Sequence, residues 1–171
     1  DGLWCALAGG GNCGITNFTM DSTASYIGLF ATNSGIMRNL IIDLDITSLN
    51  NTVTSYVGGL AGSSTNIIAN VSSTGSITYT GAVSAASSIS VYIGGLVGYS
   101  SPGTGTITSS NATGAITYID NNSASGVSLY MGGLVGYSNG SASGAVYNSW
   151  ASGAVEAQCG TSCTYMPYAY V

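Results

Sequence analysis

The sequence predicts an all-β protein folded as a parallel β-solenoid (β-helix) of roughly eight to nine short coils, with about 15–20 residues in each coil. Three observations support this prediction. A glycine-rich motif recurs through most of the chain, the apolar segments are short and rich in β-branched and aromatic residues, and patterns typical of helices are missing. A repeat of this kind indicates a stacked architecture.

The most regular repeat is a tyrosine, one apolar residue, two glycines and an apolar pair. It occurs in segments 56–63, 92–100 and 130–138, and a shorter copy begins at Tyr26. A second, weaker motif with one glycine occupies segments 70–77, 109–116 and 148–155. Glycines that precede a small or apolar pair follow one another in steps of 16, 20, 19, 19 and 20: Gly59, Gly75, Gly95, Gly114, Gly133 and Gly153. We interpret the two motifs as versions of one unit, so that each short period makes one coil.

The clearest alternating strand is predicted at residues 39–47. Leu40, Ile42, Leu44 and Ile46 face one side, and the odd-numbered residues between Asn39 and Thr47 face the other. The apolar set is expected to fill a narrow core, and glycines are expected at the corners, where they permit positive φ. With coils about 4.8 Å apart, about nine of them would make a rod of roughly 40 Å.

Three regions are expected along the chain. Residues 1–25 form an N-terminal cap or docking segment, residues 26–155 form the repeat solenoid, and residues 156–171 form a C-terminal cap or docking tail. Because the first residue is Asp1, with no initiator methionine or signal peptide before it, we interpret the chain as a mature or trimmed segment.

Both end regions carry a cysteine pair, Cys5 with Cys13 and Cys159 with Cys163. This distribution favours two local disulfides, Cys5–Cys13 and Cys159–Cys163, although sequence alone leaves three connectivities open. Free thiols or a metal site are less favoured, because the spacings do not match those of cysteine pairs that bind zinc. Disulfides are typical of an oxidising, extracellular environment.

Composition excludes several partners. The 171 residues are 45% hydrophobic and only 4% charged, with no histidine, a single cation (Arg38) and a net charge of −5. Nucleic acid and anionic membrane surfaces are not expected as partners, because both require clustered Lys and Arg. No apolar run reaches the length that spans a bilayer, so membrane insertion is not expected.

Covalent glycans are expected on some asparagines. Six asparagines begin the acceptor pattern Asn-x-Ser/Thr, and we expect several to be modified if the source is a eukaryote. Some of these matches arise by chance in a chain so rich in serine and threonine. The six candidates are Asn17, Asn50, Asn70, Asn111, Asn121 and Asn139.

One tyrosine in each tyrosine motif lies just before the glycines: Tyr26, Tyr56, Tyr92 and Tyr130. Stacked in the solenoid, these tyrosines would form an aromatic strip along one face. We favour half-buried packing between strands as the role of this strip. The alternative is a surface that stacks on sugar rings.

Catalysis is not expected. Asp43 and Asp45 lie two apart on one strand face, about 6.5–7 Å from each other, which overlaps the spacing of glycosidase carboxylates. However, the sequence offers no second acidic cluster, and no histidine or lysine to assist them. An exposed acidic strand face or a weak calcium site is favoured instead, and no cofactor is predicted. Threonine pairs at 52–54, 78–80 and 104–106 have different offsets from the glycines, so they do not predict a flat ice-binding array.

The segment Gly-Gly-Leu-Val-Gly-Tyr-Ser, followed by Asn-Ser-Trp-Ala-Ser-Gly-Ala-Val at 148–155, resembles the GLUG motif. Residues 37–42, Met-Arg-Asn-Leu-Ile-Ile, resemble the opening of such repeat arrays. The resemblance covers about residues 26–155. GLUG arrays occur in bacterial surface proteins, such as filamentous-haemagglutinin-like adhesins and immunoglobulin A1 proteases, and in surface proteins of some protists. The resemblance implies a stalk or binding region at the cell surface or outside the cell, with no catalytic residues.

Two functions are compatible with these features. We favour a structural subunit of an extracellular fibre or surface appendage that assembles head to tail with copies of itself, because open solenoid ends associate unless capped. The alternative is a glycan- or cell-binding adhesin or stalk module of a larger surface protein. The ends could also be disulfide-pinned caps, or continue into further coils. The residues expected at the assembly ends are Leu3, Trp4, Tyr165, Tyr168 and Tyr170.

Overall fold

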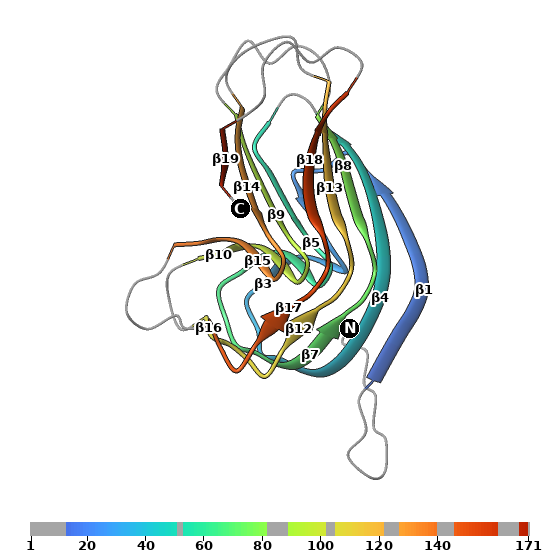
Figure 1. Ribbon diagram of the computed structural model, residues 1–171. Coiled ribbons are helices and arrows are strands. Elements are labelled where there is room, and N and C mark those ends of the chain that lie inside the picture. The colour runs from blue at the N-terminus through green and yellow to red at the C-terminus, as the bar shows by residue number, and fades with distance from the viewer. Residues whose placement is uncertain are drawn as a thin grey trace.

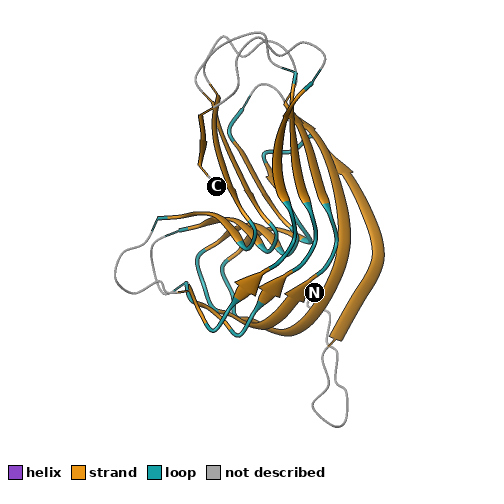
Figure 2. Cartoon of the chain, viewed as in Figure 1, coloured by secondary structure: helices purple, strands orange, loops and turns teal. Residues whose placement is uncertain are grey.

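The computed structural model describes residues 13–50, 53–81, 89–101, 105–121, 127–139, 146–160 and 168–170. Within these ranges every regular element is a β-strand and every strand pair is parallel (Figure 2). The strands form three sheets that wind around one core (Figure 1). The predicted all-β, parallel solenoid is therefore confirmed.

The strands are assigned to sheets A, B and C. Sheet C contains β3 (Phe30–Asn33), β6 (Ala61–Ser64), β10 (Val97–Ser100) and β15 (Val135–Ser138). Sheet B contains β2 (Tyr26–Ile27), β5 (Ser55–Gly58), β9 (Ile89–Gly94), β14 (Val127–Gly132) and β19 (Tyr168–Tyr170). Sheet A contains β1 (Cys13–Ser22), β4 (Met37–Asn50), β7 (Ile68–Ser73), β8 (Ile77–Gly81), β11 (Ile107–Thr108), β12 (Asn111–Ala112), β13 (Ile116–Asp120), β16 (Val146–Tyr147), β17 (Trp150–Ala151) and β18 (Val155–Cys159).

Each coil passes through sheet B, then sheet C, then sheet A. Coil 1 consists of β2 to β4, coil 2 of β5 to β8, coil 3 of β9 to β13, and coil 4 of β14 to β18. One strand extends the stack at each end: β1 pairs with β4 of coil 1 in sheet A, and β19 pairs with β14 of coil 4 in sheet B.

The prediction that each short sequence period makes one coil is wrong. Strand partners place Tyr56 beside Tyr92 and Tyr92 beside Tyr130, which are sequence steps of 36 and 38 (92 − 56 and 130 − 92). In sheet A, Ile77 lies beside Ile116, a step of 39 (116 − 77). The short sequence period is therefore half a coil. The described residues contain four coils and one further strand at each end, where the sequence predicted eight or nine coils.

The two half-coils look alike in sequence because each is an arch of strand, glycine bend and strand. They occupy different corners, however. A Cβ on Gly59, in the bend between sheets B and C, would contact Ser73 Oγ across the core, whereas a Cβ on Gly75, in the bend of sheet A, would meet the backbone of Leu44 in coil 1. Sheets A and B each have five strand layers and are offset by one layer, so the stack spans six layers, about 24 Å from first to last strand. The predicted rod length of roughly 40 Å is thus too long.

The predicted alternation in residues 39–47 is confirmed. Ile42, Leu44 and Ile46 are fully buried, and Leu40 is half-buried. The odd-numbered residues of this segment are exposed or half-exposed. The buried column continues through later coils, because parallel in-register strands place Ile46, Ile77, Ile116 and Val155 above one another. These columns of single aliphatic residues form the core.

The sheets run beyond the expected limits of the repeat region at both ends. Strand β1 lies inside the expected cap at 1–25 and adds a layer to sheet A. Strands β18 and β19 lie at the start and near the end of the expected tail at 156–171 and belong to sheets A and B.

Candidate functional site: the tyrosine column and the solenoid ends

Four tyrosines of sheet B form a continuous stack, which we call the tyrosine column. The ring centroids of Tyr26 and Tyr56 are 4.7 Å apart, those of Tyr56 and Tyr92 are 5.1 Å apart, and those of Tyr92 and Tyr130 are 4.9 Å apart. Neighbouring rings are nearly parallel, within 7–15°. The stack follows from the fold, because in-register parallel strands repeat the same side chain at the spacing between strands.

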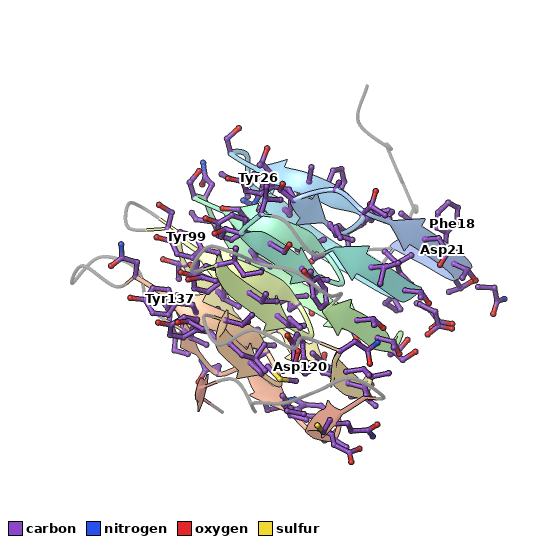
Figure 3. All side chains as sticks on the ribbon, turned by 90° about the horizontal axis from the view of Figure 1, so that it is seen from above. Phe18, Asp21, Tyr26, Tyr99, Asp120 and Tyr137 are labelled. Carbon is purple, nitrogen blue, oxygen red and sulfur yellow. The ribbon has the colours of Figure 1, made fainter. Side chains whose placement is uncertain are left out.

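A second pair of tyrosines from sheet C packs against this column. Tyr99 and Tyr137 stack on each other at 5.7 Å, and they make T-shaped contacts with sheet B rings, as between Tyr130 and Tyr137 at 5.1 Å and 73°. Figure 3 shows Tyr26, Tyr99 and Tyr137 along one side of the molecule. The sequence did not predict this second set, although a Gly-Tyr-Ser triplet that ends two motif copies, 98–100 and 136–138, marks both positions.

The stack uses the ring faces for packing within the chain. A ring such as Tyr92 has neighbours on both faces and an edge contact from Tyr99. Burial and the neighbouring tyrosines raise the pKa of Tyr56. Because sugar rings stack on aromatic faces, an internally stacked column offers little surface to them. The arrangement therefore supports packing between strands as the role of the tyrosine column.

The two aspartates considered for catalysis contact the next coil. Asp45 accepts hydrogen bonds from the backbone N–H and the hydroxyl of Ser76, at 2.8 and 2.7 Å, and these bonds lower the pKa of its carboxyl. Asp43 accepts a longer bond from the Thr74 hydroxyl at 3.3 Å. Within the described ranges no three acidic, histidine or cysteine side chains gather into a possible metal site. Both aspartates thus link coil 1 to coil 2.

A polar group inside the core was not predicted. Tyr79 and Tyr118 are fully buried and stacked at 5.7 Å, and the Tyr79 hydroxyl donates to Ser55 Oγ at 3.0 Å. Burial raises the pKa of both phenols, and the buried Asp120 raises that of Tyr118 further. In residues 116–120, Ile-Thr-Tyr-Ile-Asp, the side-chain period of two places Tyr118 and Asp120 on the same face as Ile116, which is the sequence signal for this cluster. The cluster lies within the core.

The sequon asparagines differ in accessibility. Asn17, Asn70 and Asn139 are exposed, whereas Asn111 and Asn121 are half-buried. The Asn70 side chain donates to Asn39 Oδ1 at 2.9 Å. Asn70 also belongs to a corner column of positive-φ residues, with φ values of 58°, 53°, 48° and 50° for Asn39, Asn70, Ser109 and Asn148. The side chain of Asn50 lies outside the described part. Glycosylation of these residues stays a prediction.

Of the four cysteines, the structure describes the side chain of Cys159 alone, and this residue is disulfide-bonded. Cys5 and Cys163, and the side chain of Cys13, lie outside the described residues. The pairings Cys5–Cys13 and Cys159–Cys163 therefore stay predictions.

Both ends of the described stack expose large apolar side chains. At the C-terminal end, in coil 4, Trp150 is 55% exposed, and Val146 and Tyr147 are about as accessible. At the N-terminal end, Phe18 of β1 is 51% exposed and Phe30 of β3 is 39% exposed. Among the described strands, none pairs with the outer edges of β1, β3, β15 or β18.

The predicted assembly residues are only partly visible. Leu3, Trp4 and Tyr165 lie outside the described residues, as do the side chains of Tyr168 and Tyr170. The backbone of Tyr170 lies opposite Tyr130 in the ladder between β19 and β14. It thereby occupies the fifth register position of the tyrosine column.

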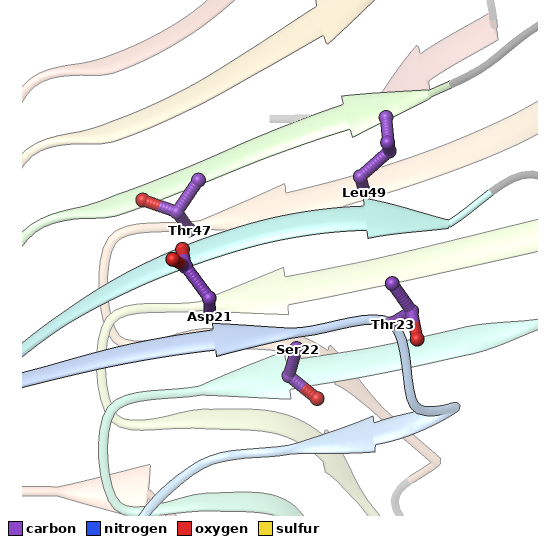
Figure 4. Close-up of a pocket in the computed structure, with 5 residues that line it drawn as sticks. All are labelled: Asp21, Ser22, Thr23, Thr47 and Leu49. Carbon is purple, nitrogen blue, oxygen red and sulfur yellow. The ribbon is translucent and has the colours of Figure 1, made fainter.

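A surface pocket of about 270 Å³ lies where the C-terminal end of β1 meets β4 (Figure 4). Its lining residues are Asp21, Ser22, Thr23, Thr47 and Leu49. The Asp21 and Thr47 side chains are neighbours there, because β1 and β4 pair in register at these two residues (Figure 4).

Comparison with known proteins places one segment in a described family. The family model described as the GLUG motif matches residues 53–78, which span β5, β6, β7 and the start of β8. The resemblance to the GLUG motif is thereby confirmed for this stretch, and the chain carries a GLUG motif. The matched stretch covers most of coil 2, so the motif corresponds to a coil with both of its arches.

No curated protein and no solved structure matches the chain. The part of the chain that the structure describes contains no helix with the length and apolar character needed to cross a membrane.

Proposed function

We propose that this chain is a structural subunit of an extracellular fibre or surface appendage, and that it assembles end to end through its solenoid termini. The observation that carries the proposal is the contrast between strand edges at the ends and strand edges within the stack. The edges are open at both described ends, where Phe18 and Trp150 are exposed beside them, whereas every strand of coils 2 and 3 is paired on both edges with neighbouring coils.

The C-terminal end supports association. Strand β18 pairs on one side with β13, and its other edge has no partner among the described strands. The same holds for β15 of sheet C. Unpaired N–H and C=O groups along such edges recruit another strand unless they are blocked. Trp150 adds a large apolar surface beside these edges.

The N-terminal end is open in the same way but presents different strands. Among the described residues, β1 and β3 are each paired along one edge only, β1 with β4 of coil 1 and β3 with β6 of coil 2. An N-terminal edge that meets a C-terminal edge is a heterologous contact, since different surfaces join. Heterologous contacts that do not close into a ring produce filaments.

A glycan- or cell-binding role is less well supported. It would need accessible ring faces along the tyrosine column, yet the inner rings stack on one another. An extracellular location agrees with the surface proteins in which GLUG motifs occur, and with a disulfide at Cys159. Of the exposed sequons, Asn70 of coil 2 would lie on the side of such a fibre, whereas Asn17 and Asn139 lie in the terminal layers of each copy.

The test is analytical ultracentrifugation of the purified chain under non-reducing conditions. We expect a concentration-dependent increase in sedimentation, and we expect Trp150→Lys to suppress it by placing a charge at the open end. Phe18→Lys should have the same effect at the other end. Ala115→Lys is the matched control, because Ala115 is exposed on coil 3 between neighbours from coils 2 and 4. Assembly that survives both end variants, or that Ala115→Lys suppresses equally, would overturn the proposal.

A further inference from the structure

Resting on the proposed function, we infer the register of the joint: a second copy adds with its β1 beside β18 of the first copy and its β2 beside β19. The two copies then share one composite coil. Sheet B of this coil comes from one copy, and sheet A comes from the next. Each copy therefore advances the fibre by five strand layers.

The offset of the sheets leads to this register. Sheet A starts one layer before coil 1, with β1, and sheet B ends one layer after coil 4, with β19. A coil runs from sheet B through sheet C to sheet A, so β19 has the position that opens a fifth coil. The β1 strand of the next copy has the position that closes it. Sheet C contributes no described strand to this layer, so sheets A and B form the joint.

Direct stacking of coil 1 on coil 4 is the competing register, with four layers per copy. It fails because β1 of the second copy would occupy the layer that β18 already fills. In sheet B, β19 already fills the layer that β2 would take. The sheets therefore permit the five-layer register and exclude the four-layer one.

Side chains match across the inferred joint. The inward column through Ile46, Ile77 and Ile116 ends in half-buried Met20 at one end and half-buried Val155 at the other. The joint stacks Val155 on the next copy's Met20, which buries both.

The outward column that ends in Trp150 begins at Gly14. The strand partners run from Gly14 to Ile41, Ser72, Asn111 and Trp150. In the joint, the bulky indole of one copy therefore lies beside a residue without a side chain in the next. The size of Trp150 is accommodated by Gly14.

One pair opposes the joint. Asp21 and Glu156 end the outward column that also contains Thr47, Thr78 and Thr117, and both are exposed. The five-layer register places these two carboxylates on adjacent strands, about 4.8 Å apart by strand spacing. Like charges on adjacent strands repel each other. The four-layer register would instead place Glu156 beside Thr47.

The experiment is helical reconstruction of the filaments by electron cryomicroscopy. We expect an axial rise per copy of about 24 Å, which is five layers at the strand spacing, and direct stacking would give about 19 Å. Any rise other than five layers overturns the register but leaves the proposed fibre intact. Absence of filaments at all concentrations overturns the proposed function itself.

A charge variant tests the same register in solution. Glu156→Gln removes the carboxylate repulsion at the joint, so we expect it to lower the critical concentration for assembly severalfold in low salt, with a smaller effect at high ionic strength. Asp43→Asn is the control, because it removes the same charge from coil 1 at a position between β1 and β7. Equal effects of the two variants would show that net charge acts rather than the Asp21–Glu156 contact, and would contradict the register.

Discussion

Tyr92 and Tyr130, which occupy the same position in successive coils, stack with ring centroids 4.9 Å apart and planes inclined by 15°. The distance between the two rings therefore reports the coil spacing directly, and their separation in the sequence gives the length of a full coil. The tyrosine column ties the coils together along the outer side of sheet B.

The column predicts a graded loss of stability. Tyr92 makes ring contacts with Tyr56, Tyr99, Tyr130 and Tyr137, so Tyr92→Ala should lower the free energy of unfolding by about 2–3 kcal/mol. Denaturant unfolding of the unassembled chain measures this change. Tyr26→Ala is the control, because Tyr26 is 41% exposed and stacks on Tyr56 at the end of the column. Equal losses for the two variants would mean that the additional ring contacts of Tyr92 do not contribute.

The glycine contacts between coils predict that alanine substitutions at Gly98 and Gly35 differ in their effect on stability. Gly98→Ala forces a methyl group against the backbone of Val57, and the neighbouring backbone cannot move without breaking the ladder. We expect a loss of about 3 kcal/mol or failure to fold, as for severe overpacking. Gly35→Ala should change stability by no more than about 0.5 kcal/mol, because a Cβ there meets one atom at 4.0 Å. Circular dichroism melts of both variants test this, and a stable Gly98→Ala protein would contradict the coil spacing.

The hydrogen bonds to Asp45 predict a pH dependence. The Ser76 hydroxyl and amide lower the pKa of the Asp45 carboxyl, so the carboxylate stabilises the fold above the pKa of the unfolded chain. This contribution is lost as the pH falls through the lower, folded-state pKa. Ser76→Ala should therefore reduce the Tm at pH 7, and the difference should shrink progressively below pH 3.8.

The control for this prediction is the double variant. If Ser76 acts through Asp45, Ser76→Ala should have little further effect on Tm in an Asp45→Asn background. A Ser76→Ala penalty that is independent of pH and of Asp45 would assign the loss to packing instead.

The sequence predicted those features that depend on local periodicity. The alternation from Leu40 to Ile46 identified inward and outward faces correctly, because the side-chain period of a strand is two and one face here is buried. The recurrence of tyrosine before glycine likewise placed four rings in one column, as the contacts between Tyr56 and Tyr92 show.

The sequence did not distinguish a half-coil from a coil. Gly59 and Gly75 each follow a strand and precede another, so their neighbours in sequence look alike. They differ in what they face: Gly59 meets Ser73 across the core and the Gly95 carbonyl of the next coil, whereas Gly75 meets the backbone of Leu44 in the preceding coil. That difference is set by contacts between distant segments, and no local pattern contains it. The packing of Tyr99 against the tyrosine column also depends on contacts between different strands, so it could not be predicted from a local pattern.

The most direct measurement is negative-stain electron microscopy of the purified chain under non-reducing conditions, over a range of concentrations. End-to-end assembly predicts unbranched filaments of uniform width, a single solenoid across, which lengthen as the concentration rises. Dispersed particles the length of one short stack at every concentration would contradict end-to-end assembly.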